Sequence, residues 1–413
     1  MHTKRDSRIS GFYKLSIEER IQKVKEFASL DDKDIAPLRR GISIEDADRM
    51  VENVIGKFEM PFGIAVNFRI NDRDYLVPMV TEESSVIAAA SNAAKIAREG
   101  NGFRTSSTEP IMIGQVQIIA KDLREAEEII LKNKGRILDI ANKQDPILIK
   151  LGGGAKRIET RIIKDMLILH IFVDVRDAMG ANAVNTMCEA VGEYIEKITN
   201  GDVNLRIISN FATERIAKAE VKIPLNIIGK KTADRIILAY KFANNDIYRA
   251  VTHNKGIMNG ITAVAIATGN DTRAIEAGAH AYAARNGVYK PLTEWKKNGK
   301  YLTGRIEIPL AVGIVGGGTI HPLAKLSLKI LDVKTAGELS EVMAAVGLAQ
   351  NFAALRALVS EGIQKGHMKL HAKNIAMIAG AKGKQIDIIA EQLIKENNIN
   401  VNRARELLVN LKI

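Results

Sequence analysis

The strongest constraint on the fold comes from the order of strand-like and helix-like stretches between residues 110 and 210. Two stretches have helical periodicity and end in glycine, residues 121–135 and 183–201. Around them lie four stretches with the length and β-branched content of strands, residues 111–119, 157–163, 166–175 and 203–209. The order strand, helix, strand, strand, helix, strand is typical of the ferredoxin-like fold, a four-stranded antiparallel sheet with helices on one face. This segment is therefore predicted to be an inserted domain.

The chain before this insert opens with two predicted helices. Ser16 with Glu19, and Ser43 with Asp46, have the spacing of capping boxes, in which each side chain satisfies a free amide at the helix start. The second helix is expected to carry an apolar face and to run on to Gly56.

A strand pair and a third helix follow. The strands are expected at residues 62–70 and 75–80, joined by the turn-prone pair Asn71-Asp72. Residues 81–100 are rich in alanine, which favours helix and lets helices approach closely. This alanine-rich helix is therefore predicted to lie at the centre of the molecule.

The chain beyond residue 215 predicts long helices separated by glycine-rich turns, at residues 232–246, 271–287 and 336–362. The last fifty residues are also helical, and Gly362 and Gly366 are spaced like a hinge. The prediction is an α+β protein with three parts: a large, mostly helical substrate domain (1–109 and 211–361), the ferredoxin-like insert (110–210) and a helical C-terminal flap (362–413).

Composition excludes several classes of protein. With 413 residues, 46% hydrophobic and 26% charged, the chain is long enough for two domains with ordinary cores. It has neither a run long enough to predict a membrane span nor a secretory signal, and its single cysteine, Cys188, excludes a disulfide framework, so a cytoplasmic protein is expected. The net charge of +12 is scattered and aromatics make up only 5%, which argues against nucleic acid and suits a phosphate-rich cofactor.

Lys255 is the first candidate for chemistry. It lies in the stretch THNKGIMNG, residues 252–260, which is otherwise poor in charge. Such a lysine is either a surface cation or one held in a pocket. Glu82 and Glu83 begin the alanine-rich helix, where dipole complementarity is the ordinary explanation. Asp271 likewise has the ordinary explanation of a helix N-cap.

Glycine turns and histidines give further candidates. Gly180 joins an apolar strand to a helix N-terminus, where free amides suit a diphosphate, but a tight turn without a ligand has the same pattern. The run Gly316 to Gly318 either lets a ligand approach or makes a sharp corner. His367 and His371 are spaced four apart, yet Met368 replaces the glutamate of a zinc signature, so no metal is expected.

Six motifs, taken in order, resemble one known family, the soluble bacterial and archaeal (class II) 3-hydroxy-3-methylglutaryl-coenzyme A reductases. They span nearly the whole chain: ENVIG (52–56), VTEESSVIAAAS (80–91), DAMGANAVNTM (177–187), THNKGIMNG (252–260), ATGND (267–271) and GHMKLHAKNIA (366–376). The resemblance implies reduction of 3-hydroxy-3-methylglutaryl-CoA to mevalonate and CoA with two nicotinamide cofactors, or the reverse reaction.

The resemblance also implies roles for individual residues. Lys255 is implied as the cation that stabilises the oxyanion, and Asp271 as the carboxylate that orients Lys255 and Glu83. Glu83 is implied as the acid of the second reduction and His367 as the proton donor to the CoA thiolate. Substrate contacts are implied for Glu52, Ser85, Arg249 and Asn259.

The cofactor and the assembly are implied in the same way. The insert matches the family's dinucleotide-binding domain, with Asp177, Met179, Gly180, Asn182 and Asn185 at the diphosphate. Asp145 matches an acidic position in relatives that prefer NADH, because a carboxylate repels a 2′-phosphate; NADH is favoured and NADPH remains possible. A homodimer with shared active sites is expected.

Two other functions are alternatives to the reductase. A hydrolase or acyltransferase acting on CoA esters needs a nucleophile, but Cys188 lies in an apolar helix and no G-x-S-x-G elbow occurs. A basic RNA-binding protein would show steeply salt-dependent binding and would consume no cofactor.

Overall fold

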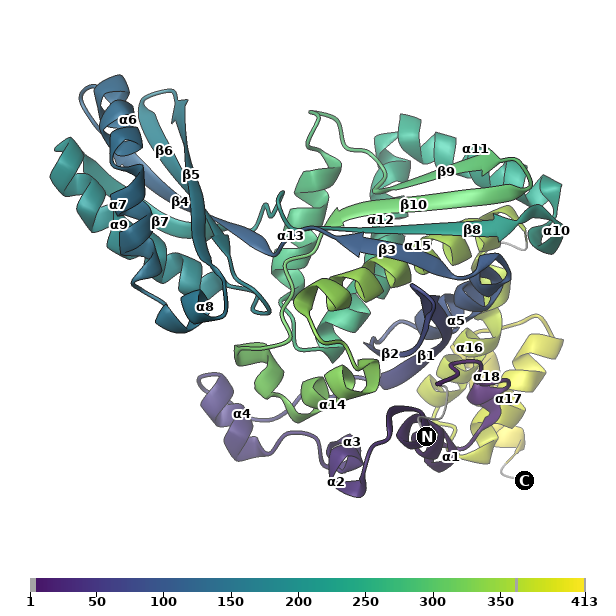
Figure 1. The fold of residues 1–413 in the computed structure, drawn as a ribbon. Coiled ribbons are helices and arrows are strands. Elements are labelled where there is room, and N and C mark those ends of the chain that lie inside the picture. The colour runs from purple at the N-terminus through teal and green to yellow at the C-terminus, as the bar shows by residue number, and fades with distance from the viewer. Residues whose placement is uncertain (1–4, 361–362, 412–413) are drawn as a thin grey trace.

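The computed structural model describes residues 5–360 and 363–411, and for residues 363–370 the helical backbone alone. The chain forms a small body and a large body, each built around its own sheet (Figure 1). It passes from the large body to the small one between residues 107 and 111, and returns between residues 209 and 216.

The large body contains a six-stranded sheet in the order β2-β1-β3-β8-β10-β9. Neighbouring strands are antiparallel except β1 and β3. The hairpin β1–β2 was expected, and Asn71 and Asp72 adopt the positive φ angles that its two-residue turn requires. The other four strands were not expected. The strands of this sheet are β1 (Phe62–Ile70), β2 (Arg73–Val80), β3 (Phe103–Ser107), β8 (Ile216–Pro224), β9 (Thr293–Asn298) and β10 (Tyr301–Pro309).

The small body has the predicted ferredoxin-like fold. Its sheet order, β5-β6-β4-β7, with every pair antiparallel, places the first and third strands in the middle. Its strands are β4 (Ile111–Ile119), β5 (Gly154–Ile163), β6 (Met166–Asp174) and β7 (Asp202–Ser209). Its helices are α6 (Leu123–Lys132), α7 (Lys134–Asn142), α8 (Pro146–Lys150) and α9 (Ala181–Thr199).

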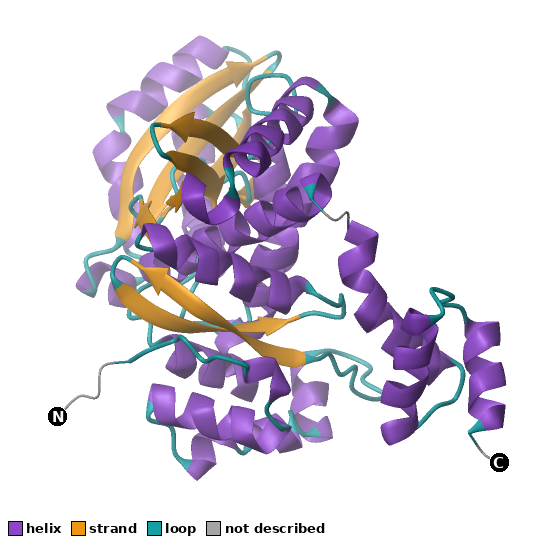
Figure 2. Cartoon of the chain, turned by 90° about the vertical axis from the view of Figure 1, so that its right-hand side faces the viewer, coloured by secondary structure: helices purple, strands orange, loops and turns teal. Residues whose placement is uncertain are grey.

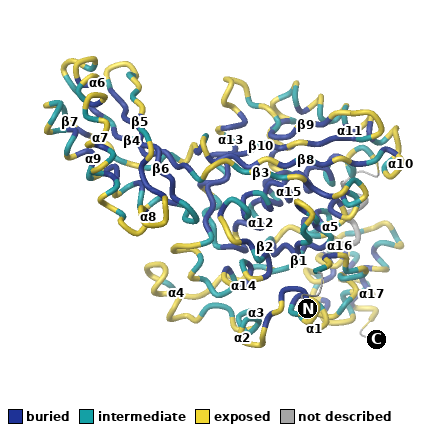
Figure 3. Tube along the Cα trace, in the orientation of Figure 1, coloured by how far each residue is buried: buried dark blue, intermediate teal, exposed yellow. Residues whose placement is uncertain are grey.

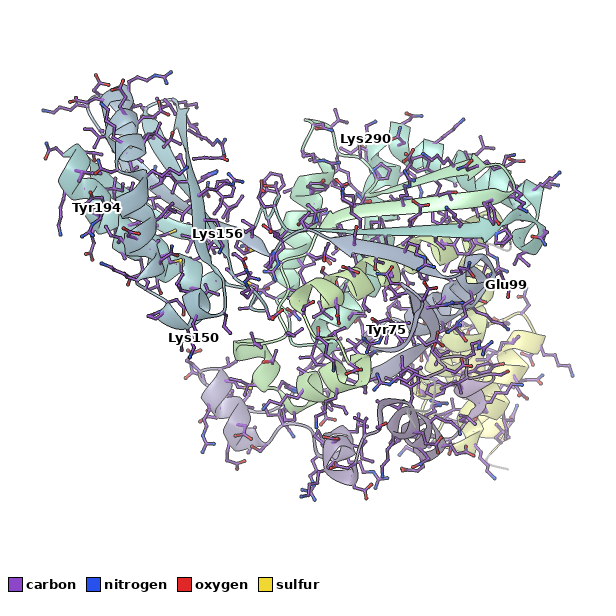
Figure 4. The ribbon with its side chains drawn as sticks, in the orientation of Figure 1. Tyr75, Glu99, Lys150, Lys156, Tyr194 and Lys290 are labelled. Atoms are coloured by element: carbon purple, nitrogen blue, oxygen red, sulfur yellow. The ribbon has the colours of Figure 1, made fainter. Side chains whose placement is uncertain are left out.

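The first helical connection of this body differs from the prediction. The chain bends at Asn133, whose side chain donates to Ile129 O and accepts from Tyr194 Oη (Tyr194 is labelled in Figure 4). Gly135, the expected helix end, lies inside α7. A further short helix, α8, begins at Pro146. The bend lets α6 and α7 each bury apolar residues against the same sheet.

A helical layer covers the large sheet. Helix α15 is its most buried member, and most of its residues are coloured as buried in Figure 3. It is the only helix in the described parts of the chain long and apolar enough to span a membrane, but 67% of that stretch is buried among the other elements, as in a core helix. The helices of this layer are α5 (Val86–Ala97), α10 (Leu225–Ile228), α11 (Lys230–Asn245), α12 (Ile247–Ala267), α13 (Thr272–Ala283) and α15 (Ala336–Val359). Helix α14 (Pro322–Leu331) covers the other face of the β1–β2 hairpin, where Leu326 and Ile330 share a hydrophobic cluster with Val66 and Leu76.

The N-terminal helices are shorter than predicted. Ser16 and Glu19 form a complete capping box, and Ser43 caps the fourth helix. That helix ends at Met50, not at Gly56, because Val51 is extended and the apolar side chains after it meet no core. These helices are α1 (Ile17–Ala28), α2 (Asp32–Ile35), α3 (Pro37–Arg40) and α4 (Ile44–Met50); single 3-10 turns occur at Phe12–Lys14, Arg98–Gly100 and Gly317–Ile320.

The C-terminal helices α16 (Ile363–Ile378), α17 (Lys384–Lys395) and α18 (Val401–Asn410) pack around a hydrophobic cluster of their own. Figure 2 shows them at the edge of the molecule, next to the C-terminus. The boundaries predicted for the large domain, the insert and the flap stay predictions.

Candidate active site

Lys255 forms an ion pair with Glu83. Its Nζ lies 2.8 Å from Glu83 Oε2, and Asn259 Nδ2 lies 3.3 Å from the same oxygen. Lys255 and Asn259 are four residues apart on α12, so they share one helix face. The lysine side chain is 60% exposed and that of Glu83 41% exposed. In the single chain Lys255 therefore lies on an open surface and not in a closed pocket, and Glu83 is also partly exposed there.

The two residues before Lys255 anchor its helix. His253 is buried, and its Nε2 lies 2.6 Å from Thr293 Oγ1 and 3.0 Å from Asn351 Nδ2. Asn254 donates to Lys290 O (Lys290 is labelled in Figure 4) and accepts from Leu292 N. Burial, with a smaller contribution from the Arg249 cation, lowers the pKa of His253 to about 3, so the imidazole is neutral. The polar residues of THNKG therefore fix α12 against β9 and α15.

Glu83 lies in the turn before α5, not in its first turn as predicted. The helix begins at Val86 because Ser85 has a left-handed φ of 74°, which interrupts the helical backbone. Residues with such angles cluster at functional sites, where the surrounding structure offsets the strain. The turn thus directs Glu83 towards α12, and it brings Ser85 and Glu83 into one cleft.

Asp271 differs from its expected position. It caps α13 by accepting from Arg273 N and Ala274 N, which is the ordinary capping alternative. It also pairs with the Arg273 guanidinium, which holds the pKa of Asp271 below its usual value. Among the contacts of the described residues, Asp271 touches neither Lys255 nor Glu83.

The glycine run Gly316 to Gly318 makes a corner. A Cβ on Gly318 would lie 1.8 Å from Gly269 O, and one on Gly269 would lie 2.2 Å from Gly318 O. The two backbones therefore touch, and no side chain fits between them. This contact presses the ATGND turn, which holds Asp271, against the loop before α14.

Two predicted substrate residues lie away from the ion pair. Arg249 is half-buried in the first turn of α12, and burial lowers its pKa. Glu52 is exposed in the turn after α4. In the described single chain neither has a side-chain contact with Lys255 or Glu83.

A cleft of about 1810 Å³ opens beside Glu83 and Ser85. The N-terminal segment, the β1–β2 hairpin, α5, the ATGND turn and His321 line it. Its volume exceeds the roughly 1,000 Å³ of the larger small-molecule sites. The cleft is large enough for an extended ligand such as an acyl-CoA.

The DAMGAN turn carries the features that suit a diphosphate. Gly180 precedes α9 with a φ of 98°, and a Cβ there would meet Val175 at 2.4 Å. Helix α9 has no side-chain cap at its start and no acidic residue in its first turn. Its first amides and partial positive charge are thus available to an anion.

Some of the predicted cofactor residues form side-chain hydrogen bonds to other elements, and others are exposed or packed in the core. The Asp177 carboxylate accepts from Ala336 N, at the start of α15, and Asn185 Oδ1 accepts from Ile208 N on β7. Asn182 is exposed in the first turn of α9, whereas Met179 packs against the core of the small body. Asp145 caps α8 through Oδ1, which accepts from Leu148 N. Asp177 and Asn185 thus tie elements together.

A second glycine loop near this turn was missed by the sequence analysis. Gly152 O accepts from Arg176 Nη2 and from Lys156 Nζ, and Lys156 also donates to Gly153 O (Figure 4 labels Lys156). The run of three glycines, Gly152 to Gly154, that leads into β5 was the signal that could have identified it. The loop and the DAMGAN turn are therefore neighbours in the small body.

The remaining candidates concern His367 and the alternatives to a reductase. The side chain of His367 lies outside the described residues. Among the side chains that the structure does describe, no group of three or more potential ligands could hold a metal. Burial raises the pKa of Cys188 to about 12, so its thiol is a poor nucleophile and the hydrolase alternative gains no support.

Comparison with known proteins shows the family of the chain. The family model described as hydroxymethylglutaryl-coenzyme A reductase matches residues 16–372. A 3-hydroxy-3-methylglutaryl-coenzyme A reductase of Archaeoglobus fulgidus is 56% identical over 98% of this chain and 95% of its own. A probable reductase of Borreliella burgdorferi is 39% identical over 94% of this chain and 90% of its own.

Solved structures give the same result. A reductase from Streptococcus pneumoniae matches with a TM-score of 0.83 and 42% identity, covering 97% of this chain and 99% of its own. The class II enzyme of that organism, bound to NADPH in open conformations, matches with a TM-score of 0.82 and 41% identity, over 97% and 100% of the two chains. The fold and these matches thus define an oxidoreductase of class II architecture. The chain belongs to the hydroxymethylglutaryl-coenzyme A reductase family.

Proposed function

We propose that the protein reduces 3-hydroxy-3-methylglutaryl-CoA to mevalonate and free CoA, or runs the reverse reaction. The forward reaction takes two hydrides and two protons; the C–S bond breaks, and the carbonyl carbon becomes a primary alcohol. A bound nicotinamide supplies the hydride of each reduction. The Lys255–Glu83 contact is the observation that carries this proposal, because it pairs a fixed cation with an acid in a chain of this family.

Lys255 stabilises the negative oxygen that forms on the thioester carbon. A fixed charge aimed at a developing oxyanion is worth about 3 to 4 kcal/mol in the barrier. Asn259, one helical turn along, holds the Glu83 carboxylate beside the ammonium group. Because His253 and Asn254 anchor α12, the cation needs little reorganisation during the reaction.

Two residues donate the protons, and a third orients the cation. When the hemithioacetal collapses, His367 protonates the CoA thiolate, and the aldehyde that remains is mevaldehyde. Glu83 donates the proton that the second alkoxide needs. Asp271 orients Lys255 in the assembled site, which requires its carboxylate to leave the exposed Arg273.

Substrate binding uses the cleft beside Glu83. Arg8, Arg39, Lys57 and Lys95 line it, and such cations suit the phosphates of CoA. Glu52, Ser85, Arg249 and Asn259 contact the 3-hydroxy-3-methylglutaryl portion.

The cofactor binds to the small body. The open amides of α9 and Asn182 hold the diphosphate, and Met179 and Gly180 shape the turn beneath it. Asp177 and Asn185 act there by fixing the turn and the helix. Asp145 accepts hydrogen bonds from the ribose and favours NADH over NADPH. The NADPH-bound relative supports use of a nicotinamide dinucleotide.

The working protein is a homodimer with active sites between its subunits. Ile55 and Phe58, beside the ENVIG motif, are 103% and 92% exposed in the single chain. Large apolar side chains this exposed are typical of interaction surfaces. Association through this segment would bring Glu52 to the partner and cover the open Lys255.

One assay tests the function. Purified protein is mixed with 3-hydroxy-3-methylglutaryl-CoA and NADH or NADPH, the absorbance of the reduced nicotinamide is followed, and mevalonate and CoA are quantified. Two cofactor molecules should disappear for each CoA released. Absence of turnover in either direction with both cofactors would refute the proposal.

A further inference from the structure

Arg215 is the most buried arginine whose charge the proposed mechanism leaves unexplained. It lies where the chain returns from the small body, between β7 and β8, and its residue is 5% exposed. Its guanidinium donates to Ala178 O at 3.1 Å, to Met179 O at 3.2 Å and to Val312 O. Within the described chain it forms no ion pair, so backbone carbonyls satisfy this buried cation.

These carbonyls belong to two segments with different roles. Ala178 and Met179 lie in the DAMGAN turn, whereas Val312 follows β10 in the large body. Next to the arginine, Ile314 N donates to Asp177 O at 2.9 Å, and Ala178 pairs with Val315 in a parallel bridge. The guanidinium thus holds the DAMGAN turn against the segment that follows β10 in the large body.

The same segment after β10 also contacts the ATGND turn of the large body. Gly313 N donates to Asn270 Oδ1 at 2.7 Å, and Asn270 Nδ2 donates back to Gly313 O at 3.2 Å. Asn270 immediately precedes Asp271 in the ATGND turn. A continuous set of hydrogen bonds therefore connects the cofactor turn, the segment around Gly313 and the catalytic side of the large body.

We propose that Arg215 is a positioning residue, which sets the distance between the dinucleotide turn and the substrate site by clamping residues 178–179 to Val312. The inference rests on the proposed function. A planar guanidinium reaches several acceptors in fixed directions, and a lysine ammonium lacks that geometry. Because hydride transfer needs reacting atoms placed within a fraction of an ångström, loosening this clamp slows turnover more than it weakens substrate binding.

The test compares Arg215→Lys and Arg215→Met with Arg305→Met in the full-length protein. Arg305 lies on β10, is 53% exposed and pairs with Glu220 on the sheet surface, so it controls for loss of one arginine. For each protein, kcat and KM, the Kd of NADPH by fluorescence and the Kd of CoA by calorimetry are measured, with the melting temperature as a check of folding.

Arg215→Lys should keep its fold, lose about 100-fold in kcat, the cost of a misplacement near 1 Å, bind NADPH more weakly and bind CoA within twofold of the parent. Arg215→Met should lose more, and Arg305→Met should match the parent. Unchanged kcat and NADPH binding in folded Arg215→Lys would overturn the inference, and so would equal weakening of both ligands. If the parent itself neither binds NADPH nor turns over, the proposed function fails instead.

Discussion

Lys255 Nζ and Glu83 Oε2 lie 2.8 Å apart, although their residues are 172 positions apart in the chain. Because this cation pairs with a carboxylate that lines the cleft, replacing Lys255 by alanine should lower kcat by about 10² to 10³, the loss expected for one oxyanion partner. The Kd of CoA, measured by calorimetry, should stay within twofold. Lys297→Ala is the control. It removes an exposed lysine of β9 that pairs with Asp234 of α11, and it should retain activity. Undiminished turnover in Lys255→Ala would contradict the assignment.

Asp145→Asn should change cofactor preference without unfolding α8. Asparagine keeps the Oδ1 that accepts from Leu148 N, so the cap survives while the charge disappears. The ratio of kcat/KM for NADPH to that for NADH should rise on the order of tenfold, which corresponds to about 1.4 kcal/mol. Steady-state kinetics with both cofactors measure the ratio. An unaltered ratio means that Asp145 does not contact the ribose.

His253→Gln should flatten the dependence of stability on pH. The folded-state pKa of His253 is lowered from 6.5 to about 3, mainly by burial. The unfolded chain therefore binds this proton first, and the associated stability is complete above pH 6.5 and lost as pH falls towards 3. Between pH 7 and pH 5 the parent should lose about 2 kcal/mol more than the variant. Urea unfolding at both pH values gives the difference, and parallel curves would contradict it.

Gly318→Ala and Gly317→Ala form a matched pair. A Cβ on Gly318 would lie 1.8 Å from Gly269 O, whereas one on Gly317 has nothing within 4 Å. Gly318→Ala should cost about 1 to 3 kcal/mol of stability, as in other overpacked sites, and lower kcat because the ATGND turn must move. Calorimetric melting and the nicotinamide assay measure the two effects. Equal behaviour of both variants would show that the backbones separate freely.

Phe58→Asp should dissociate the proposed homodimer. A carboxylate in place of a side chain that is 92% exposed in the single chain would be desolvated at an apolar interface. Light scattering after size exclusion should give the mass of one chain. The nicotinamide assay should show loss of activity. Val409→Asp, at an apolar position of α18 that is 61% exposed, is the control. A Phe58→Asp protein that keeps the mass of the parent would exclude this segment as the interface.

The local parts of the fold could be predicted from the sequence. The four strands and last helix of the small body follow from periodicity, and Asn71-Asp72 specifies a hairpin without help from distant residues. Strands β3 and β8 were missed because their partners lie far away: Phe103 pairs with Val221, and Val221 with Gly304. Sheet pairing at such separation leaves little mark on a single strand. Strands β9 and β10 form a local hairpin through Gly299 and Lys300, which was missed as well.

The candidate site divides along the same line. The roles of the site residues came from the resemblance of the motifs to a known family, because the residues alone left both Lys255 and the turn at Gly180 with an ordinary structural explanation. Tertiary structure decided which distant groups meet: it joins Lys255 to Glu83, and it brings the buried Arg215 to the carbonyls of the DAMGAN turn. A hydrogen bond between residues far apart depends on how helices and sheets pack, and only the folded chain fixes that packing.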